Sequence, residues 1–208
     1  MSVSRETVPE PPDEVSKLFG SQHGLIRQFT HILGTDGVTR GVIGPREVQR
    51  IWERHIINCA VVQPAVPSRA RVADVGSGGG LPGIVWAIMR PDIHMTLIDP
   101  LLRRTTFLEQ IVGELDLVNV SVVRARAEEV QETFDVVTAR AVARMKKLVP
   151  WTMPLVRDGG VLFALKGQNA SSELEEAREV LNQFGARSMQ VTCYETTDIP
   201  TRVVEVRK

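Results

Sequence analysis

The chain has 208 residues, of which 43% are hydrophobic, so we expect one domain with a buried core and a small appendage. Its 25 basic and 25 acidic residues cancel, so the overall charge does not indicate a nucleic acid partner, and only the placement of charge is informative. Cys59 and Cys193 are the only cysteines, which argues against a disulfide framework and against a cysteine-rich metal site. The N-terminus lacks a signal-peptide pattern and no apolar run is long enough to cross a membrane, so we expect a cytoplasmic protein.

The first 66 residues predict a proline-rich lead and a small helical cap. Residues 1–14 are expected to be disordered, and residues 15–66 form the cap. Apolar spacing predicts a helix over 15–33, which a glycine turn at 34–37 ends. A second amphipathic helix is predicted over 45–60, in which His55 is expected to pack or cap rather than to catalyse. Its opposite side carries a basic stripe that is either a solvated face or a phosphate-contacting face: Arg46, Arg50 and Arg54.

Residues 67–208 alternate between predicted strands and helices, which indicates a parallel sheet with right-handed crossovers. The predicted strands are 71–75, 95–99, 119–124, 134–138 and 160–165, and the helices are 82–90, 101–115, 127–131 and 144–156. A helix over 171–184 precedes a hairpin made of 188–195 and 202–207. The pattern predicts an α/β class I, Rossmann-like methyltransferase fold, with a mostly parallel seven-stranded sheet and an antiparallel C-terminal strand.

A strand that breaks into a glycine-rich turn is the most informative segment. The first predicted strand contains Asp74, and glycines follow at alternate positions, at Gly76, Gly78 and Gly80, before Pro82 opens a helix. Glycine tolerates positive φ and close approach of a ligand, and a helix start presents free N–H groups. The turn therefore predicts a pocket for an adenosine-bearing cofactor, although a glycine turn without a ligand is the alternative.

The spacing in this turn favours S-adenosylmethionine (SAM) over a dinucleotide. The third glycine of a dinucleotide fingerprint would stand at position 81, which is Leu81. The Asp74 carboxylate suits the cationic amino group of SAM, whereas it would repel a pyrophosphate. A nicotinamide oxidoreductase of the short-chain type also needs Tyr-x-x-x-Lys, and Asp198 follows the only tyrosine, Tyr194, at that spacing.

Further cofactor contacts are predicted beyond the carboxyl ends of later strands, where open α/β sheets bind ligands. Asp99 ends the second strand roughly 20 residues after the first glycine, a distance at which an acid binds ribose hydroxyls; capping of the next helix is the alternative. Ala127 and Glu128 follow the third strand, where a backbone N–H and a carboxylate would contact adenine.

Basic residues gather on the same rim, after the strand ends. They are Arg103, Arg104, Arg124, Arg126, Arg140, Arg144, Lys146, Lys147 and Lys166. Many acidic residues lie instead on the predicted helix at 171–184, so a protein with no net charge can have a basic surface around the strand ends. This distribution favours a polyanionic substrate such as RNA, and ordinary loop charge is the alternative.

The absence of two sequence motifs reduces the number of possible methyl acceptors. Amino-methylating enzymes carry Asn/Asp-Pro-Pro-aromatic after strand four, where this chain has Thr138-Ala139-Arg140-Ala141, and neither cysteine stands near the site as cytosine C5 chemistry requires. Guanine N7 has a free lone pair and loses no proton, so alignment matters more than a general base. We therefore assign no catalytic residue, expect no metal, and name Arg140 and Lys166 as positioning candidates.

Several segments together resemble one family from about residue 45 to the C-terminus. They are residues 74–84, 97–99, 103–104, 107–108, 127–128, 139–141 and 164–167, which include Gly-Leu-Pro-Gly and Ala-Leu-Lys-Gly. The chain is similar to the bacterial 16S rRNA guanine-N7 methyltransferase G family, also called glucose-inhibited division protein B. The resemblance implies SAM as donor, S-adenosylhomocysteine as product, and a guanine N7 in the 530 loop of 16S rRNA as acceptor, on free RNA or on the small ribosomal subunit.

The resemblance also implies roles for individual residues. Cofactor contacts are implied at Gly76, Leu81, Ala127, Glu128 and Arg140, and RNA or phosphate contacts at Arg103, Arg126, Arg140 and Lys166. The chain departs from the family where Arg-His-x-x-Asp-Ser is usual, because Asn58 and Cys59 replace the Asp-Ser pair, and where Asn-Leu-Thr is usual, near residues 40–43. These departures concern docking of the RNA more than the type of reaction.

We interpret the chain as a SAM-dependent rRNA guanine-N7 methyltransferase that needs neither a membrane nor an obligate protein partner. Two alternatives remain open: an RNA-binding module with a vestigial cofactor pocket, and a SAM methyltransferase that acts on another RNA base. The predicted cofactor contacts are Asp74, Gly76, Gly78, Gly80, Leu81, Asp99, Ala127, Glu128 and Arg140. The predicted RNA contacts are Arg46, Arg50, Arg54, Arg103, Arg126 and Lys166.

Overall fold

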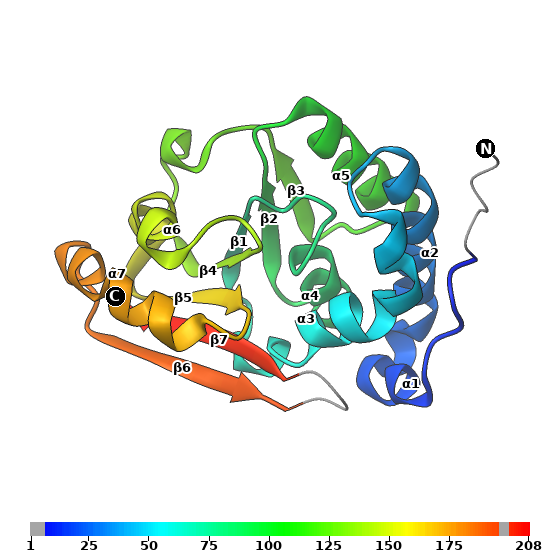
Figure 1. The fold of residues 1–208 in the computed structure, drawn as a ribbon. Helices are drawn as coiled ribbons and strands as arrows, with labels where there is room; N and C mark the ends of the chain where they lie inside the picture. Colours follow the sequence, from blue (N-terminus) through cyan, green and yellow to red (C-terminus); the bar gives the residue numbers. More distant parts are fainter. Residues whose placement is uncertain (1–6, 196–199) are drawn as a thin grey trace.

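The computed structural model describes residues 7–195 and 200–208, and these form a seven-stranded sheet in the order β3-β2-β1-β4-β5-β7-β6 (Figure 1). The parallel strands are β1 (Arg71–Val75), β2 (His94–Ile98), β3 (Val120–Val123), β4 (Phe134–Arg140) and β5 (Val156–Lys166). The C-terminal strand β7 (Thr201–Arg207) lies antiparallel between β5 and β6 (Ser188–Tyr194). The predicted fold class is confirmed.

Helices cover both faces of the sheet (Figure 1). On one face lie α4 (Gly83–Met89), α5 (Leu102–Glu114) and the cap, and on the other lie α6 (Met145–Thr152) and α7 (Ala170–Gln183). Neighbouring residues of β1 point to opposite faces, so Val72 joins the core on the cap side and Ala73 the core beneath α6 and α7. The strand ends that form the site therefore lie between two packed layers.

The first helical region continues further than predicted. It contains α1 (Asp13–Phe19), a 3₁₀ turn (Gly20–Gln22) and α2 (His23–Thr39), so the predicted turn at 34–37 is wrong. Gly34 and Gly37 are buried inside α2, and a Cβ at Gly34 would lie 2.5 Å from a Val8 methyl carbon. These glycines permit close packing within a helix rather than ending it, which local sequence rules do not reveal.

The predicted α-helix over 45–60 is also wrong in detail. The segment is a 3₁₀ helix (Pro45–Arg50), a π-helix (Trp52–Ile57) and one α-helical turn, α3 (Asn58–Ala60). Widened π turns occur frequently at functional sites. Here the Arg54 carbonyl, within the π turn, accepts a hydrogen bond from Arg140 of β4 at 3.0 Å.

The expected disordered lead is wrong from residue 7 onward, and residues 1–6 lie outside the described part of the chain. Val8 packs against the core, the Pro9 carbonyl accepts a hydrogen bond from Trp52 Nε1 at 2.8 Å, and α1 begins at Asp13. The boundary between a cap at 15–66 and a domain at 67–208 stays a prediction. Among the described residues, no helix combines the length and the hydropathy needed to span a bilayer.

Candidate active site

The turn between β1 and α4 requires its glycines. Gly76, Gly78 and Gly80 have φ values of +71°, +56° and +85°, in the region that L side chains rarely adopt. A Cβ at Gly76 would lie 2.6 Å from Val142 Cγ2, and one at Gly80 would lie 2.5 Å from Ile84 Cγ1. The turn therefore combines a left-handed backbone with close contacts on both sides.

Asp74 lies beneath this turn with one carboxylate oxygen unsatisfied. Its side chain has no exposed surface; Oδ2 accepts the Gly83 N–H at 3.0 Å, whereas Oδ1 is buried without a hydrogen-bond partner. Burial raises the pKa of Asp74 to about 7, against the opposing effects of the Gly83 N–H and the Arg140 charge. A buried acceptor without a donor is costly, so the site fits a cationic amino group such as that of SAM.

Asp99 directly follows the neighbouring strand β2 and is fully buried. Its Oδ1 accepts the Leu101 N–H at 3.0 Å, and its Oδ2 accepts the Gly78 N–H at 3.1 Å and pairs with Arg104 Nη1 at 3.3 Å. The contact with the Leu101 N–H lies just before the first turn of α5 and does not satisfy the free N–H groups of that turn, so it is not the helix cap named as an alternative. A ribose contact at Oδ2 would require Arg104 to give up its place.

Two cavities meet at Gly76. One, of about 190 Å³, lies toward the cap and is lined by the Gly76–Gly79 backbone together with Leu81, Arg104 and Arg140. The other, of about 130 Å³, lies toward α6 and is lined by Ala127, Glu128 and Trp151. Gly76 lines both cavities, with Leu81 and Arg140 in the first and Ala127 and Glu128 in the second, and their role as cofactor contacts stays a prediction.

Arg140 stands where the first cavity meets a wide mouth of about 770 Å³. Its guanidinium is held by atoms of the cap: Cys59 Sγ at 3.3 Å, the Arg54 carbonyl at 3.0 Å and His55 Nδ1 at 2.7 Å. The other ring nitrogen of His55, Nε2, is hydrogen-bonded to the Glu47 carboxylate oxygen Oε2 at 2.9 Å. The cap therefore contributes directly to the site.

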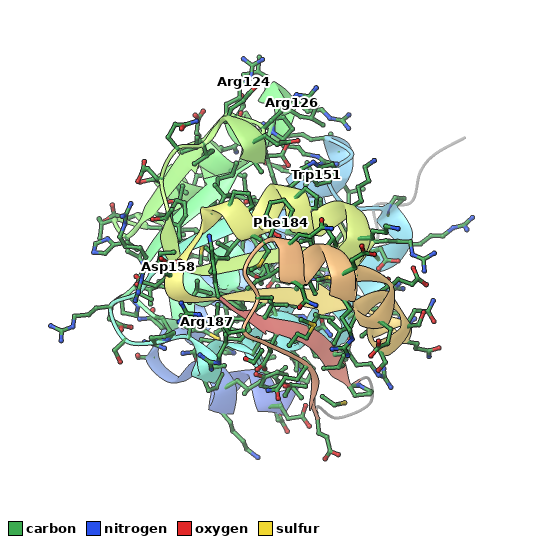
Figure 2. All side chains as sticks on the ribbon, turned by 90° about the vertical axis from the view of Figure 1, so that its left-hand side faces the viewer. Arg124, Arg126, Trp151, Asp158, Phe184 and Arg187 are labelled. Carbon is green, nitrogen blue, oxygen red and sulfur yellow. The ribbon has the colours of Figure 1, made fainter. Side chains whose placement is uncertain are left out.

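The residues predicted to contact RNA differ in their exposure to solvent. Arg46, Arg50, Arg54, Arg103 and Arg126 are exposed, although Arg54 pairs with Glu47 at 3.3 Å. Figure 2 shows Arg126 beside Arg124, projecting from one end of the molecule.

Lys166 differs from these residues, because its side chain is only 9% exposed. Its Nζ donates to the Ala143 carbonyl at 2.5 Å and pairs with Glu173 at 2.9 Å. This geometry favours a structural role, in which Lys166 ties the end of β5 to α7 and to the loop after β4, over the predicted contact with phosphate.

Comparison with known proteins decides the family. The family described as rRNA small subunit methyltransferase G (GidB) matches residues 22–201. The chain belongs to this family. Relatives named ribosomal RNA small subunit methyltransferase G include one from Thermobifida fusca, 54% identical over 82% of this chain and 73% of its own length, and one from Nocardioides sp., 50% identical over 91% and 76%. As a member of the methyltransferase G family, the protein is a methyltransferase.

Solved structures of other methyltransferases share its fold. The structure of M. jannaschii TYW2 in complex with AdoMet has a TM-score of 0.58 and 17% identity over 75% of this chain and 76% of that one. Ribosomal protein L11 methylase from Lactobacillus delbrueckii subsp. bulgaricus also has a TM-score of 0.58, with 17% identity over 73% and 77%. At this identity the likeness shows the fold alone, which is that of the SAM-dependent methyltransferases.

Asn58 and Cys59, where the sequence resemblance leads one to expect Asp-Ser, join the cap to β7 and to α4. Asn58 Nδ2 lies 2.5 Å from Thr201 Oγ1 on β7, and the Cys59 carbonyl accepts the Trp86 Nε1–H at 2.8 Å. Burial raises the pKa of the Cys59 thiol above its usual range, so the thiol stays neutral beside Arg140.

Sequence reasoning missed Glu47 and His55 as part of the site. In a regular α-helix His55 would share a side with the apolar residues, and packing was the ordinary interpretation. The change from a 3₁₀ helix to a π-helix instead brings Glu47 to the imidazole ring. The adjacent Arg54 and His55 were the available signal in the sequence, and they did not indicate Glu47 as the partner.

Proposed function

We propose that this methyltransferase transfers a methyl group from SAM to N7 of a guanine in the 530 loop of 16S rRNA. The observation that carries the proposal is the junction at Arg140 and Ala141, which line both the cavity beside the glycine turn and the wide basic mouth. A donor held at the turn and a base entering through the mouth would meet at this junction.

The cofactor would lie along the strand ends. Asp74 Oδ1 would accept from the amino group, the turn at Gly76, Gly78 and Gly80 with Leu81 would contact the methionine part, and Asp99 would bind the ribose after Arg104 moves aside. Ala127 and Glu128 line the cavity that would receive adenine. The unsatisfied Asp74 oxygen and the positive φ values of the glycines support this arrangement.

Bound SAM would supply an electrophilic methyl group on a sulfonium, with S-adenosylhomocysteine as the product. The N7 lone pair is free, so no residue of the chain has to remove a proton. The chain's task is to hold donor and acceptor in line, since alignment alone accounts for large rate effects.

The RNA would be held by charge around the mouth. Arg46, Arg50, Arg54, Arg103 and Arg126 are exposed, and Arg54 lines the mouth; these arginines would contact phosphates, whether the substrate is free rRNA or the small ribosomal subunit in the cytoplasm. Lys166 would act indirectly, by holding the loop that forms one wall of the mouth.

The test is methylation of small ribosomal subunits purified from cells that lack this protein. The subunits are incubated with labelled SAM and the protein, and the modified nucleotide is mapped by mass spectrometry. One new 7-methylguanosine in the 530 loop is the expected result. A methyl group on another base would identify a different acceptor, and absence of SAM binding by calorimetry would favour an RNA-binding module with a vestigial pocket.

A further inference from the structure

Glu47, His55 and Arg140 form a continuous hydrogen-bonded series that runs from the cap to the end of β4. The Glu47 carboxylate meets His55 Nε2 at 2.9 Å, and His55 Nδ1 meets Arg140 Nη2 at 2.7 Å. An imidazole that donates from Nε2 and accepts at Nδ1 must be neutral and in one tautomer. The series therefore specifies both the protonation state and the orientation of the ring.

The surroundings of His55 favour that neutral state. Its side chain is 12% exposed, and the charged groups that face it are Glu47, Arg140 and Arg54. Burial and the Arg140 charge lower the pKa of His55 to about 4, although Glu47 opposes the shift. Near neutral pH, Nδ1 is therefore free to accept from the guanidinium.

The hydrogen bonds found for the Arg140 guanidinium among the described residues all lead to the cap. They end at His55 Nδ1, the Arg54 carbonyl and Cys59 Sγ. Arg140 reaches the site from β4, yet its charged end is oriented by a different part of the fold. A rigid set of supporting contacts is what holds a functional group in a productive geometry.

We propose that His55 and Glu47 are positioning residues that hold the Arg140 guanidinium at the junction of the cofactor cavity and the RNA mouth. The proposal rests on the proposed function, because that junction is where donor and base would meet. His55 acts through Arg140 and does not touch the reacting atoms. Loss of its Nδ1 acceptor leaves the guanidinium free to leave the junction.

The first test compares His55→Leu with His55→Asn, whose amide oxygen can take the place of Nδ1. His55→Leu is expected to lower kcat by about 10- to 100-fold, in line with the effect of misplacing a site group, while KM for RNA and the Kd of SAM change less than about threefold. His55→Asn should recover most of the loss. His31→Leu, an exposed histidine of α2, is the matched control and should behave as wild type.

A double-mutant cycle separates positioning from a general effect on the fold. In an Arg140→Ala background, His55→Leu should cause little further loss of kcat, because its effect passes through the missing guanidinium. Fully additive losses would overturn the proposal. If His55→Leu does not fold, Glu47→Leu, which removes the acceptor for His55 Nε2–H, takes its place in the same cycle with Glu53→Leu as its control.

Nitrogen-15 NMR of the histidine rings tests the series without any methyl transfer. The expected spectrum at neutral pH shows His55 as the Nε2–H tautomer with a hydrogen-bonded Nδ1, and this signature should change in Arg140→Ala. An Nδ1–H tautomer would overturn the proposal. If the wild type binds SAM but does not methylate the rRNA, the proposed function fails, whereas the NMR result still decides whether the series exists.

Discussion

Asp74 provides the main support at the residue scale for the proposed cofactor site. The carboxyl group is fully buried, one oxygen lacks a donor, and burial raises its pKa to about 7. The protein without cofactor therefore holds Asp74 largely protonated at slightly acid pH. An amino group arriving at Oδ1 favours the ionised carboxylate and lowers this pKa again.

SAM binding should consequently release a proton from Asp74. Between about pH 5.5 and 7 the affinity should rise with pH, by up to about tenfold per unit, because the carboxyl group must ionise before it pairs with the amino group. Calorimetry in buffers of different ionisation enthalpy measures the released proton. Asp74→Asn should bind SAM more weakly and show little proton release; an unchanged proton count in this variant would contradict the assignment.

His55 and Asp74 should also affect stability with opposite signs. The folded pKa of His55, about 4, lies below its unfolded value, so its contribution is lost as the pH falls through the window between the two. The folded pKa of Asp74, about 7, lies above its unfolded value, so its contribution is lost as the pH rises through its window. Over roughly pH 5 to 6.5 the two effects oppose each other, at about 1.4 kcal/mol per pH unit for each group.

Urea unfolding as a function of pH checks this balance. In the same window, the unfolding free energy of His55→Leu should increase relative to wild type as the pH falls, because only the Asp74 effect remains. Asp74→Asn should show the reverse slope. Parallel profiles for both variants and the wild type would mean that neither pKa is shifted in the folded protein.

The β1–α4 turn is the element on which the proposed cofactor site depends. Its backbone conformation and its contacts both exclude a side chain, as the φ of +85° at Gly80 and the closeness of Ile84 illustrate. Gly113, near the end of α5, offers the opposite case, since a Cβ there would meet nothing within 4 Å. The two glycines separate a structural requirement from the general effect of adding a methyl group.

Gly80→Ala should lower the unfolding free energy by about 1–3 kcal/mol and weaken SAM binding, because the strained backbone and the contact with Ile84 must both relax. Gly113→Ala should be neutral or slightly stabilising, as expected for alanine in a helix. Urea unfolding and calorimetry with SAM measure the two effects. Gly76→Asp, which adds a charged side chain where Val142 packs, should abolish SAM binding; full affinity in that variant would show that the cofactor lies elsewhere.

The elements also differ in how well sequence patterns predict them. The strands were predicted to within a few residues because each is a short apolar run bounded by breakers, and the turn was found because its glycines serve a local backbone requirement. The prediction of the cap was wrong where tertiary contacts determine the backbone conformation. Gly34 and Gly37 stay helical because other segments pack on them. His55 was expected to pack or cap rather than to catalyse, but its partners could not be predicted, because Glu47 and Arg140 meet it only through the 3₁₀–π geometry and the end of β4.

The whole molecule has no net charge, but its charged residues are distributed unevenly over the surface. Figure 2 shows Arg124 and Arg126 at one end of the view and Arg187 well away from them. Arg46 and Arg50 are exposed on the cap, within the segment that also supplies partners for Arg140. This arrangement predicts that RNA binding depends on a subset of the arginines.

Removing Arg46 and Arg50 together should weaken binding of an rRNA fragment that contains the 530 loop and reduce its salt dependence. Loss of two phosphate contacts corresponds to a change of about 1.4 to 1.8 in the slope of log K against log salt. Arg187→Ala is the matched control and should leave the slope unchanged. The test is to measure binding of the fragment over a range of KCl concentrations. Equal slopes for the wild type, the double variant and Arg187→Ala would exclude Arg46 and Arg50 as phosphate contacts.

The shared core beneath the cap bears on how a nucleotide reaches the site. Phe29 and Trp52 of the cap are buried in the same apolar cluster as Trp86 of α4 and Phe107 of α5. Swinging the cap away would expose these aromatic side chains to water, at a cost of about 1.5–3 kcal/mol for each large side chain. We therefore expect the protein to stay closed during turnover while the RNA moves, with the target guanine flipped out of its stack to reach the donor.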